Sequence, residues 1–366
     1  MTREWGINGR FLTQPFSGVQ RYAHEILAHL DALIAERHPL AEGLAAELIV
    51  PPGTSNLPEL RAIPVRVAGK GGGHGWEQLR LPRAVRGSLL NLGNTGPVAL
   101  SRQIVCLHDA NTRVFPASYS LAFRTLYRVL FPALGRRARI VATVSNYSAD
   151  TLVNYGIAPK QKLRVIPNGH EHALRWQPRH SERTRSVAGR NTIVLLGSPA
   201  PHKNVAMLLG LAGALESEGL RIAVVGSRDS RVFQAGSTTG SDAPNVTWLG
   251  RLSDDEIAAL LEDCLCLAFP SIVEGFGLPA VEAMARGCPV VSSNSASLPE
   301  VCGDAALYAA PNDPAAWLTQ LSRLARDETM RTELIRRGAE QAKKFSWRRS
   351  AELYLAAMRD LDQSTA

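Results

Sequence analysis

The sequence contains few cysteines, and they form no recognisable pattern. The five are Cys106, Cys264, Cys266, Cys288 and Cys302, with no CxxC spacing and no histidine-rich tract beside them. An odd number of cysteines inside apolar runs argues against a disulfide framework and against a zinc site. We therefore expect reduced thiols within the cores of the protein.

Long apolar runs and targeting segments are missing as well. No stretch approaches the roughly 18 to 20 apolar residues of a membrane span, and the first ten residues lack the basic-then-apolar pattern of a signal peptide. Internal repeats and heptads are also absent. These absences predict a cytoplasmic protein, and a peripheral position at the inner face of the membrane stays open.

The positive charge that is present lies in one half of the chain. Residues 1–170 contain 20 Lys and Arg against 10 Asp and Glu, whereas residues 171–366 contain 21 against 23, and the net charge is +8. Such an excess favours a phosphate-bearing partner or an anionic membrane surface on the first half, although a basic surface also serves solubility. We expect no nucleic-acid partner.

The length of 366 residues and the pattern of the chain predict two α/β domains. Short β-rich apolar runs alternate with helical patterns in both halves, as in parallel sheets covered by helices. The polar, arginine-rich segment 170–191 is typical of a linker. The expected strands span 46–52, 63–69, 88–94, 103–109, 139–145 and 163–169, then 192–198, 221–227, 246–250, 264–271 and 288–293.

The segment SIVEGFGLPAVEAMARGCPVV, residues 271–291, carries the strongest functional signal. It follows a buried strand and predicts a helix that starts near Gly277, with Pro279 in the first turn. Glu274 then lies in the loop at the carboxyl end of a parallel strand, where open α/β sheets bind ligands. A helix start favours phosphate, and the carboxylate of Glu282 suits two adjacent hydroxyls. The alternative is that both glutamates only complement the helix dipole.

This segment resembles the E-x7-E motif of the retaining glycosyltransferases of family 4, which have the GT-B fold. The resemblance extends over nearly the whole chain. It includes INGRFLTQPFSGVQRYAHEIL, CLHDANTRVFP, VATVSNYSADTL, VIPNG, GSPAPHKNVAMLL, VTWLGRLSDDEIAALL and FSWRRSAELYLAAM. It implies an acceptor-binding domain at 1–170, a nucleotide-sugar donor domain at 171–345, and a final helix at 346–366 that crosses back to the first domain. The two doubly wound, Rossmann-like domains are expected to face each other across a cleft.

The resemblance also assigns the residues of the E-x7-E segment. Glu274 should bind hydroxyls of the transferred sugar and Glu282 the ribose. The amides around Phe276, Gly277 and Leu278 should hold the diphosphate. The two carboxylates would thus grip the two ends of a nucleotide sugar.

Lys203, in GSPAPHKN, offers a cation to the departing diphosphate. A fixed cation stabilises charge that develops in the transition state, although a lysine at a helix start is often only a surface residue. The resemblance places Ser198 at the donor phosphates, where many members of the family carry arginine, so this site should hold one cation fewer.

Four further positions follow from the resemblance. Gly18 should let the backbone approach the donor phosphates, and His108 should lie beside the reacting sugar and the acceptor hydroxyl. The backbone at Arg251 and Leu252 should meet the nucleobase. Alternatively, Gly18 is a turn residue and His108 a histidine satisfied at the end of a strand. His108 and Asp109 have no further ligand cluster beside them, so no metal site is predicted.

The arginine-rich segment 118–140 has two interpretations. Phe123, Leu126, Leu130 and Leu134 alternate with arginines, as in an amphipathic helix on an anionic membrane. The same stripe fits a helix packed on a core, and Pro132 is expected to interrupt the helix. The packed interpretation is preferred.

We therefore expect a retaining, metal-independent glycosyltransferase with no bound cofactor. It would move a hexose from a nucleoside-diphosphate sugar to a hydroxyl of a saccharide or lipid-linked glycan precursor in cell-surface polysaccharide biosynthesis. The first choice of hexose is mannose, with GDP-mannose as the donor. UDP-glucose or a deoxysugar nucleotide are alternative donors. The rival classes are a catalytically silent nucleotide-sugar-binding subunit and a dinucleotide oxidoreductase, and the second lacks an early G-x-G-x-x-G motif.

Overall fold

The chain folds into two compact units. The computed structural model describes residues 2–196, 200–226 and 243–364. Unit 1 comprises Met1–Arg113, Tyr119–Asn168 and Ser346–Ala366, and unit 2 comprises Val114–Ser118 and Gly169–Phe345. Unit 2 is therefore inserted between Asn168 and Ser346, and its two ends meet where the His170 N–H donates to the Phe345 carbonyl at 3.2 Å.

Unit 1 contains a seven-stranded sheet in the order β3-β2-β1-β4-β5-β6-β7. All neighbouring strands are parallel. The strand order reverses between β1 and β4, which creates a switch point at the carboxyl edge. The strands are β1 (Arg3–Asn8), β2 (Leu44–Val50), β3 (Val65–Val67), β4 (Ser88–Asn91), β5 (Gln103–Cys106), β6 (Ile140–Thr143) and β7 (Leu163–Val165).

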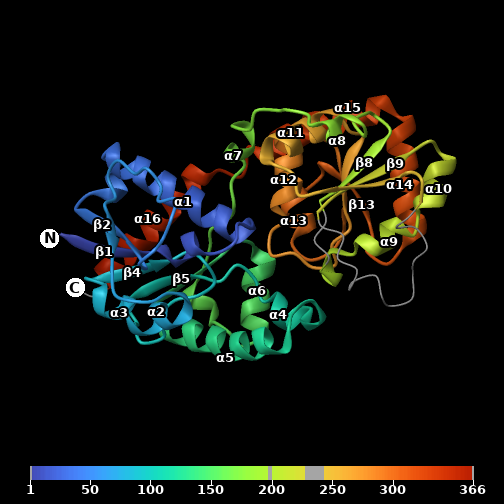
Figure 1. The fold of residues 1–366 in the computed structure, drawn as a ribbon. Helices are drawn as coiled ribbons and strands as arrows, with labels where there is room; N and C mark the ends of the chain where they lie inside the picture. The colour runs from blue at the N-terminus through green and yellow to red at the C-terminus, as the bar shows by residue number, and fades with distance from the viewer. Residues whose placement is uncertain (1, 197–199, 227–242, 365–366) are drawn as a thin grey trace. The chain divides into compact units, whose positions relative to one another are not determined.

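Helices cover this sheet, and the last helix of the chain packs beside the first (Figure 1). The α-helices are α1 (Gly18–Ala35), α2 (Gly73–Leu79), α3 (Leu81–Ala84), α4 (Asn111–Val114), α5 (Leu121–Arg137), α6 (Asn146–Asn154) and α16 (Trp347–Gln363). The 3-10 helices of the first half are η1 (Gly9–Thr13), η2 (Pro39–Ala41), η3 (Pro116–Ser118) and η4 (Lys160–Lys162).

Unit 2 repeats the design with a six-stranded sheet in the order β10-β9-β8-β11-β12-β13. Its neighbouring strands are all parallel, and the order reverses between β8 and β11. The strands are β8 (Thr192–Leu196), β9 (Arg221–Val225), β10 (Val246–Gly250), β11 (Cys266–Phe269), β12 (Val290–Ser293) and β13 (Ala306–Ala309).

The helices of unit 2 begin in the segment that the sequence assigned to a linker. That assignment is wrong in part, because residues 170–191 carry two short helices that belong to unit 2. The helices are α7 (Glu171–Leu174), α8 (Glu182–Arg185), η5 (Pro201–Lys203), α9 (Val205–Leu209), α10 (Ala212–Ser217), α11 (Asp254–Asp263), α12 (Leu278–Ala285), α13 (Leu298–Cys302), α14 (Pro314–Arg326) and α15 (Glu328–Ala342).

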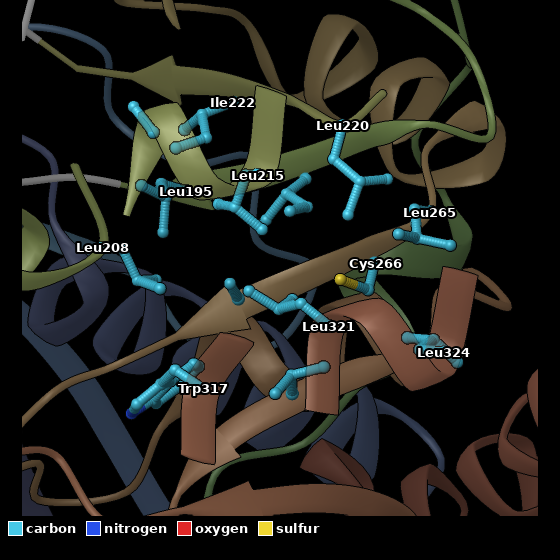
Figure 2. Packing of buried hydrophobic residues seen from close by; sticks show 14 of the residues in the cluster. Leu195, Leu208, Leu215, Leu220, Ile222, Leu265, Cys266, Trp317, Leu321 and Leu324 are labelled. Carbon is cyan, nitrogen blue, oxygen red and sulfur yellow. The ribbon is translucent and has the colours of Figure 1, made fainter. Parts of the chain in front are cut away.

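A hydrophobic core of unit 2 lies between β8, β9, β11 and the helices α10 and α14. Figure 2 shows side chains from these elements pointing toward one another, with Leu321 and Trp317 from α14. Trp317 is fully buried, and its indole N–H donates to the Ala310 carbonyl at 3.0 Å. The buried polar atom is therefore satisfied.

Buried aromatic side chains join α1 to α16 in unit 1. Tyr22 and Tyr354 are fully buried, and their hydroxyls lie 2.9 Å apart. Tyr22 also donates to the Ile166 carbonyl at 3.1 Å, and its ring packs edge-on against Trp347 at 5.6 Å. This apolar contact explains why residues after 345 return to the first unit.

Two expectations about secondary structure are corrected. β13 was not predicted, since it has only four residues, two of them alanine, and pairs with β12 alone. Pro132 does not interrupt α5, which runs through it to Arg137. Leu130 and Leu134 are buried as the packed interpretation requires, whereas Phe123 and Leu126 are exposed.

The cysteine and membrane expectations can be compared with the structure directly. All five cysteines are free and buried. Among the described residues, no helix has both the length and the apolar character needed to cross a bilayer.

Asp362, near the end of α16, should anchor this helix to unit 1. Its carboxylate accepts from Arg3 Nε at 2.7 Å, from Trp5 Nε1 at 3.0 Å and from Arg102 at 3.1 Å. Asp362→Asn should lower the melting temperature by on the order of 5 °C, because three donors lose their anionic acceptor. Asp360→Asn, at an exposed position of the same helix, is the matched control and should change little. Equal effects of the two substitutions in a thermal melt would contradict the anchoring role.

Candidate active site

The loop from Pro270 to Gly277 lies at the carboxyl end of β11 and leads into α12. Gly277 has φ +101°, and a Cβ built there would lie 2.5 Å from Leu298 Cδ2. The position therefore requires glycine for two independent reasons. α12 begins at Leu278 with Pro279 in its first turn, as the sequence predicted, and its N-cap Gly277 offers no side chain to the first-turn N–H groups.

Serine hydroxyls from the segment after β12 hold this loop in place. Ser297 Oγ lies 3.0 Å from the Glu274 carbonyl and 2.9 Å from the Phe276 carbonyl, and it is fully buried. Ser295 Oγ donates to the Ile272 carbonyl at 2.8 Å. Three carbonyl groups of the loop are thus hydrogen-bonded without regular structure, which fixes the backbone from which the Glu274 side chain extends.

Lys203 and Glu274 meet in unit 2. Lys203 Nζ donates to Glu274 Oε1 at 2.7 Å, and the two side chains are only 22% and 11% exposed. They follow β8 and β11, the neighbouring strands between which the sheet order reverses. The structure therefore brings together two of the predicted site residues at the position where doubly wound sheets bind ligands.

His202, next to Lys203, is a buried neutral histidine. Burial lowers the pKa of His202 to about 4, and the neighbouring Lys203 charge acts in the same direction. Ser118 Oγ accepts from the His202 N–H at 3.2 Å and lies 2.8 Å from Nδ1. The His202 carbonyl in turn accepts from the Ile272 N–H at 2.8 Å. His202 therefore ties the lysine segment to the loop of Glu274.

Glu282 has a different partner, His172 of α7. Its Oε1 lies 2.8 Å from His172 Nε2, and the imidazole side chain is only 1% exposed. The Trp176 ring packs edge-on against the imidazole at 5.5 Å. The residue that orients Glu282 thus belongs to the segment that the sequence assigned to a linker. Sequence reasoning missed His172, because its partner lies 110 residues away and no periodicity marks it.

The remaining predicted residues of unit 2 differ in how far they are buried. Phe276 and Leu278 are buried at the start of α12, and the Phe276 ring packs against Phe345 at 5.2 Å. Arg251 is exposed and Leu252 half-buried, between β10 and α11. Ser198 lies outside the described residues.

His108 of unit 1 is locked as one tautomer. Its Nε2 lies 2.9 Å from the Leu92 carbonyl, and a carbonyl can only accept, so Nε2 carries the proton. Burial lowers the pKa of His108 to about 4, and Tyr22 packs edge-on against the ring at 4.7 Å. Nδ1 of this neutral imidazole is therefore an acceptor at neutral pH. The geometry of His108 fits both interpretations of this residue, a histidine whose hydrogen bonds are satisfied at the end of a strand and a histidine beside the reacting sugar.

Gly18 begins α1 at an exposed position of unit 1. A Cβ built on it would meet no atom within 4 Å. Packing within the described residues therefore gives no reason for glycine at this position.

A buried ion pair near the end of β1 was also not predicted. Arg10 Nε lies 3.1 Å from Glu77 Oε1, which also accepts from Asn8 Nδ2 at 2.8 Å and from Thr95 Oγ1 at 2.9 Å. The pKa of Glu77 is lowered despite burial, which by itself raises it, because His74, Arg10 and these hydrogen bonds favour the carboxylate. The cluster fixes the carboxyl edge of β1 and β4.

Metal-binding side chains do not cluster in the described parts of the chain. Within residues 2–196, 200–226 and 243–364, no group of three or more His, Cys, Asp and Glu side chains is placed to hold a metal ion. The metal independence expected from the sequence stays a prediction.

Comparison with known proteins identifies the family. Residues 177–341 match the family model described as Glycosyl transferases group 1. O-antigen chain mannosyltransferase B of Escherichia coli is 30% identical over 275 residues, which are 69% of this chain and 68% of that protein. The serotype-specific mannosyltransferase WbdA of Escherichia coli is 27% identical over 266 residues, which are 71% of this chain but only 32% of the relative.

Solved structures match the chain over nearly its whole length. Sucrose-phosphate synthase from Thermosynechococcus elongatus superimposes with a TM-score of 0.71 at 16% identity, covering 99% of this chain and all of that one. HepE from Anabaena, solved with UDP and glucose, gives a TM-score of 0.67 at 16% identity over 98% of this chain and 99% of that one. The chain belongs to the glycosyl transferases group 1 family and has the GT-B fold of two parallel α/β domains.

The buried neutral His108 makes stability depend on pH. Between the ordinary value of 6.5 and the folded value of about 4, the unfolded chain binds a proton that the folded unit does not. Stability should therefore fall as the pH falls through this window, by up to about 1.4 kcal/mol per pH unit for this residue. Melting temperatures measured from pH 8 to pH 5 should show a shallower fall for His108→Asn than for the wild type. Parallel curves for the two proteins would rule out this contribution.

Proposed function

We propose that the protein is a retaining, metal-independent glycosyltransferase that uses a nucleoside-diphosphate sugar. The transferred unit is a hexose, with mannose from GDP-mannose as the first candidate. The acceptor is a hydroxyl of a saccharide or a lipid-linked glycan precursor for a cell-surface polysaccharide. The O-antigen function named for the E. coli mannosyltransferase B supports this choice of sugar and product class.

The observation that carries the proposal is the ion pair of Lys203 and Glu274 beside the start of α12. Two largely buried charges at a strand-order switch point, next to a helix start without a side-chain cap, suit a ligand with both phosphates and hydroxyls. Lys203 would bind the departing diphosphate together with the amides at Phe276, Gly277 and Leu278. Glu274 would then accept from hydroxyls of the sugar.

The nucleoside end is assigned to Glu282 and to the backbone at Arg251 and Leu252. Glu282 is oriented by His172, and its carboxylate would accept from ribose hydroxyls. The roles of Gly18, His108 and Ser198 rest on the resemblance. His108 would accept from a sugar hydroxyl through Nδ1, since its Nε2 proton is committed to Leu92.

Retention requires that the new bond forms on the face from which the old one leaves. The bond from the anomeric carbon to the phosphate oxygen breaks, and the bond to the acceptor oxygen forms on that same face. The acceptor proton passes to the departing phosphate oxygen, so no protein carboxylate becomes covalently attached. The partly desolvated charge of Lys203 lowers the barrier because it stabilises the negative charge that collects on the diphosphate.

A catalytically silent nucleotide-sugar-binding subunit is the alternative. It would bind nucleotide through Glu282 and transfer no sugar. The intact Lys203 and Glu274 pair disfavours this alternative.

A panel of nucleotides would test the donor site. GDP, UDP, dTDP, ADP and NAD are added separately, with EDTA present, and the melting temperature is measured. A nucleoside diphosphate that binds only the folded protein should raise it, with GDP expected to act most strongly. A rise with NAD alone, or with none of the five, would remove the proposed donor site. Transfer from the nucleotide sugar of the matching base, in EDTA, then tests catalysis and separates the enzyme from the silent subunit.

Glu274→Gln and Glu282→Gln should separate chemistry from binding. The first should reduce turnover by a factor of 100 or more and leave nucleotide affinity nearly unchanged, because it removes a contact to the reacting sugar. The second should weaken nucleotide affinity by about tenfold, since a carboxylate acceptor is lost. Titration of the nucleotide and steady-state kinetics measure the two effects. Equal losses of affinity in both variants would contradict the assigned roles.

His172→Ala should act through Glu282. Without the imidazole the carboxylate loses its fixed orientation, so nucleotide affinity should fall by about three- to tenfold with turnover at saturating donor nearly retained. His180→Ala is the matched control, because His180 also pairs with a carboxylate, Asp263, but on the outside of unit 2. If both substitutions weaken the nucleotide equally, the positioning role of His172 is excluded.

A further inference from the structure

Helix α5 exposes apolar side chains on a face that the described residues leave uncovered. Leu121 is 74% exposed and Val129 68%, followed by Leu126 at 43% and Phe123 at 39%. These four are more than a third of the eleven large apolar side chains exposed in the described parts of the chain. Single exposed apolar residues need no explanation, but such a concentration on one helix marks an interaction surface.

Three of the four, Leu121, Leu126 and Val129, form a second face of α5 that points away from the core of unit 1. Phe123 lies toward the core side instead, where its ring stacks on Tyr127 at 4.2 Å. Tyr127, Leu130 and Leu134 are buried in the core of unit 1. Since successive residues are about 100° apart on a helix, Leu121, Leu126 and Val129 lie together on the other side. Figure 1 shows α5 on the outside of the unit to which it belongs. The helix is therefore apolar toward the core and apolar again toward solvent.

Arginines accompany this second apolar face, and carboxylates do not. Residues 110–149 contain six arginines and no Asp or Glu. Arg124 and Arg128 are exposed on α5, and neither is paired with a carboxylate in the described structure. Arg136 and Arg137 add two more exposed cations at its end. Their charges are available to an anionic partner.

We propose that α5 docks on an anionic lipid surface. Leu121, Leu126 and Val129 would enter the boundary between headgroups and acyl chains, while Arg124 and Arg128 bind headgroup phosphates. A nucleic acid would satisfy the arginines but would offer no apolar layer to the leucines. A second copy of this face would set arginines against arginines. The inference is independent of the proposed reaction, although such docking would bring the protein to lipid-linked acceptors.

Vesicle sedimentation of the full chain tests the proposal. Vesicles of phosphatidylcholine alone are compared with vesicles that contain about 30% phosphatidylglycerol. We expect binding to the anionic vesicles that is at least roughly tenfold stronger than to the neutral ones, and that weakens as salt rises.

Two double variants divide the interaction into its parts. Arg124→Gln with Arg128→Gln should weaken binding to anionic vesicles by about thirtyfold, since each arginine near such a surface contributes a factor of about five. Leu126→Ser with Val129→Ser should weaken it by a similar factor. Arg336→Gln with Arg337→Gln is the matched control, because it removes the same charge from the exposed surface of α15 in unit 2. The control should bind nearly as the wild type does. All of these positions except the half-buried Arg337 are exposed, so unchanged melting temperatures should verify the fold.

Several outcomes would overturn the proposal. Equal binding to neutral and anionic vesicles would exclude a role of the arginines. If the control variant weakened binding as much as the Arg124→Gln with Arg128→Gln variant does, the effect would come from the net charge of the protein and not from α5. Absence of binding to both kinds of vesicle would exclude a lipid surface. A dimer that forms in vesicle-free solution, and that Leu126→Ser with Val129→Ser dissociates, would show that this face is covered by a second copy instead. Failure of the nucleotide panel would leave the vesicle result unaffected, so the two proposals can be judged separately.

Discussion

The candidate site depends on one constraint: an irregular loop near the interior must have its backbone groups satisfied. The loop between β11 and α12 carries Glu274, yet it has neither strand nor helix partners of its own. Ser295 and Ser297 supply the missing hydrogen bonds from the segment after β12, and Gly277 permits a backbone turn that a side chain would block. Without these contacts, the backbone at Glu274 would not be held in the position from which its side chain reaches Lys203.

The two glutamates are held by unlike partners, and that difference organises the site. Glu274 is paired with a cation, so its charge is balanced before any ligand arrives. Glu282 is held by a histidine that is itself packed against Trp176. An ionic partner can be shared with an incoming phosphate, whereas a buried and packed partner stays where it is. The pair of Glu274 and Lys203 therefore suits the reacting end of the donor, where negative charge develops on the diphosphate. The pair of Glu282 and His172 suits the end of the donor that is bound but does not react.

Much of this could be predicted from sequence because it is local. The start of α12 at Leu278 follows from Gly277 and Pro279, and the buried strand before it follows from its composition. The partners could not be predicted in the same way. His172 lies in a polar segment with no periodicity, and Ser297 is one serine among several. Arg10 and Glu77 are 67 residues apart. In each case the topology of the fold brings together residues that are distant in the sequence, and no local sequence pattern predicts the contact. β13 was missed for a related reason, since four residues with little β propensity become a strand only because β12 offers an edge.

The return of α16 to unit 1 has a consequence for how the protein is made. Tyr354 and Trp347 complete the aromatic core around Tyr22, and Asp362 reaches the first strand. During synthesis these residues emerge from the ribosome after the whole of unit 2. Unit 2 is continuous from Gly169 to Phe345 apart from one short segment that is made earlier, so it can finish folding first. Unit 1 is synthesised first, but the apolar side of α1 stays uncovered until α16 has been synthesised. The half of the chain that is translated first is therefore the half that folds last, and this interval is when it would depend most on chaperones.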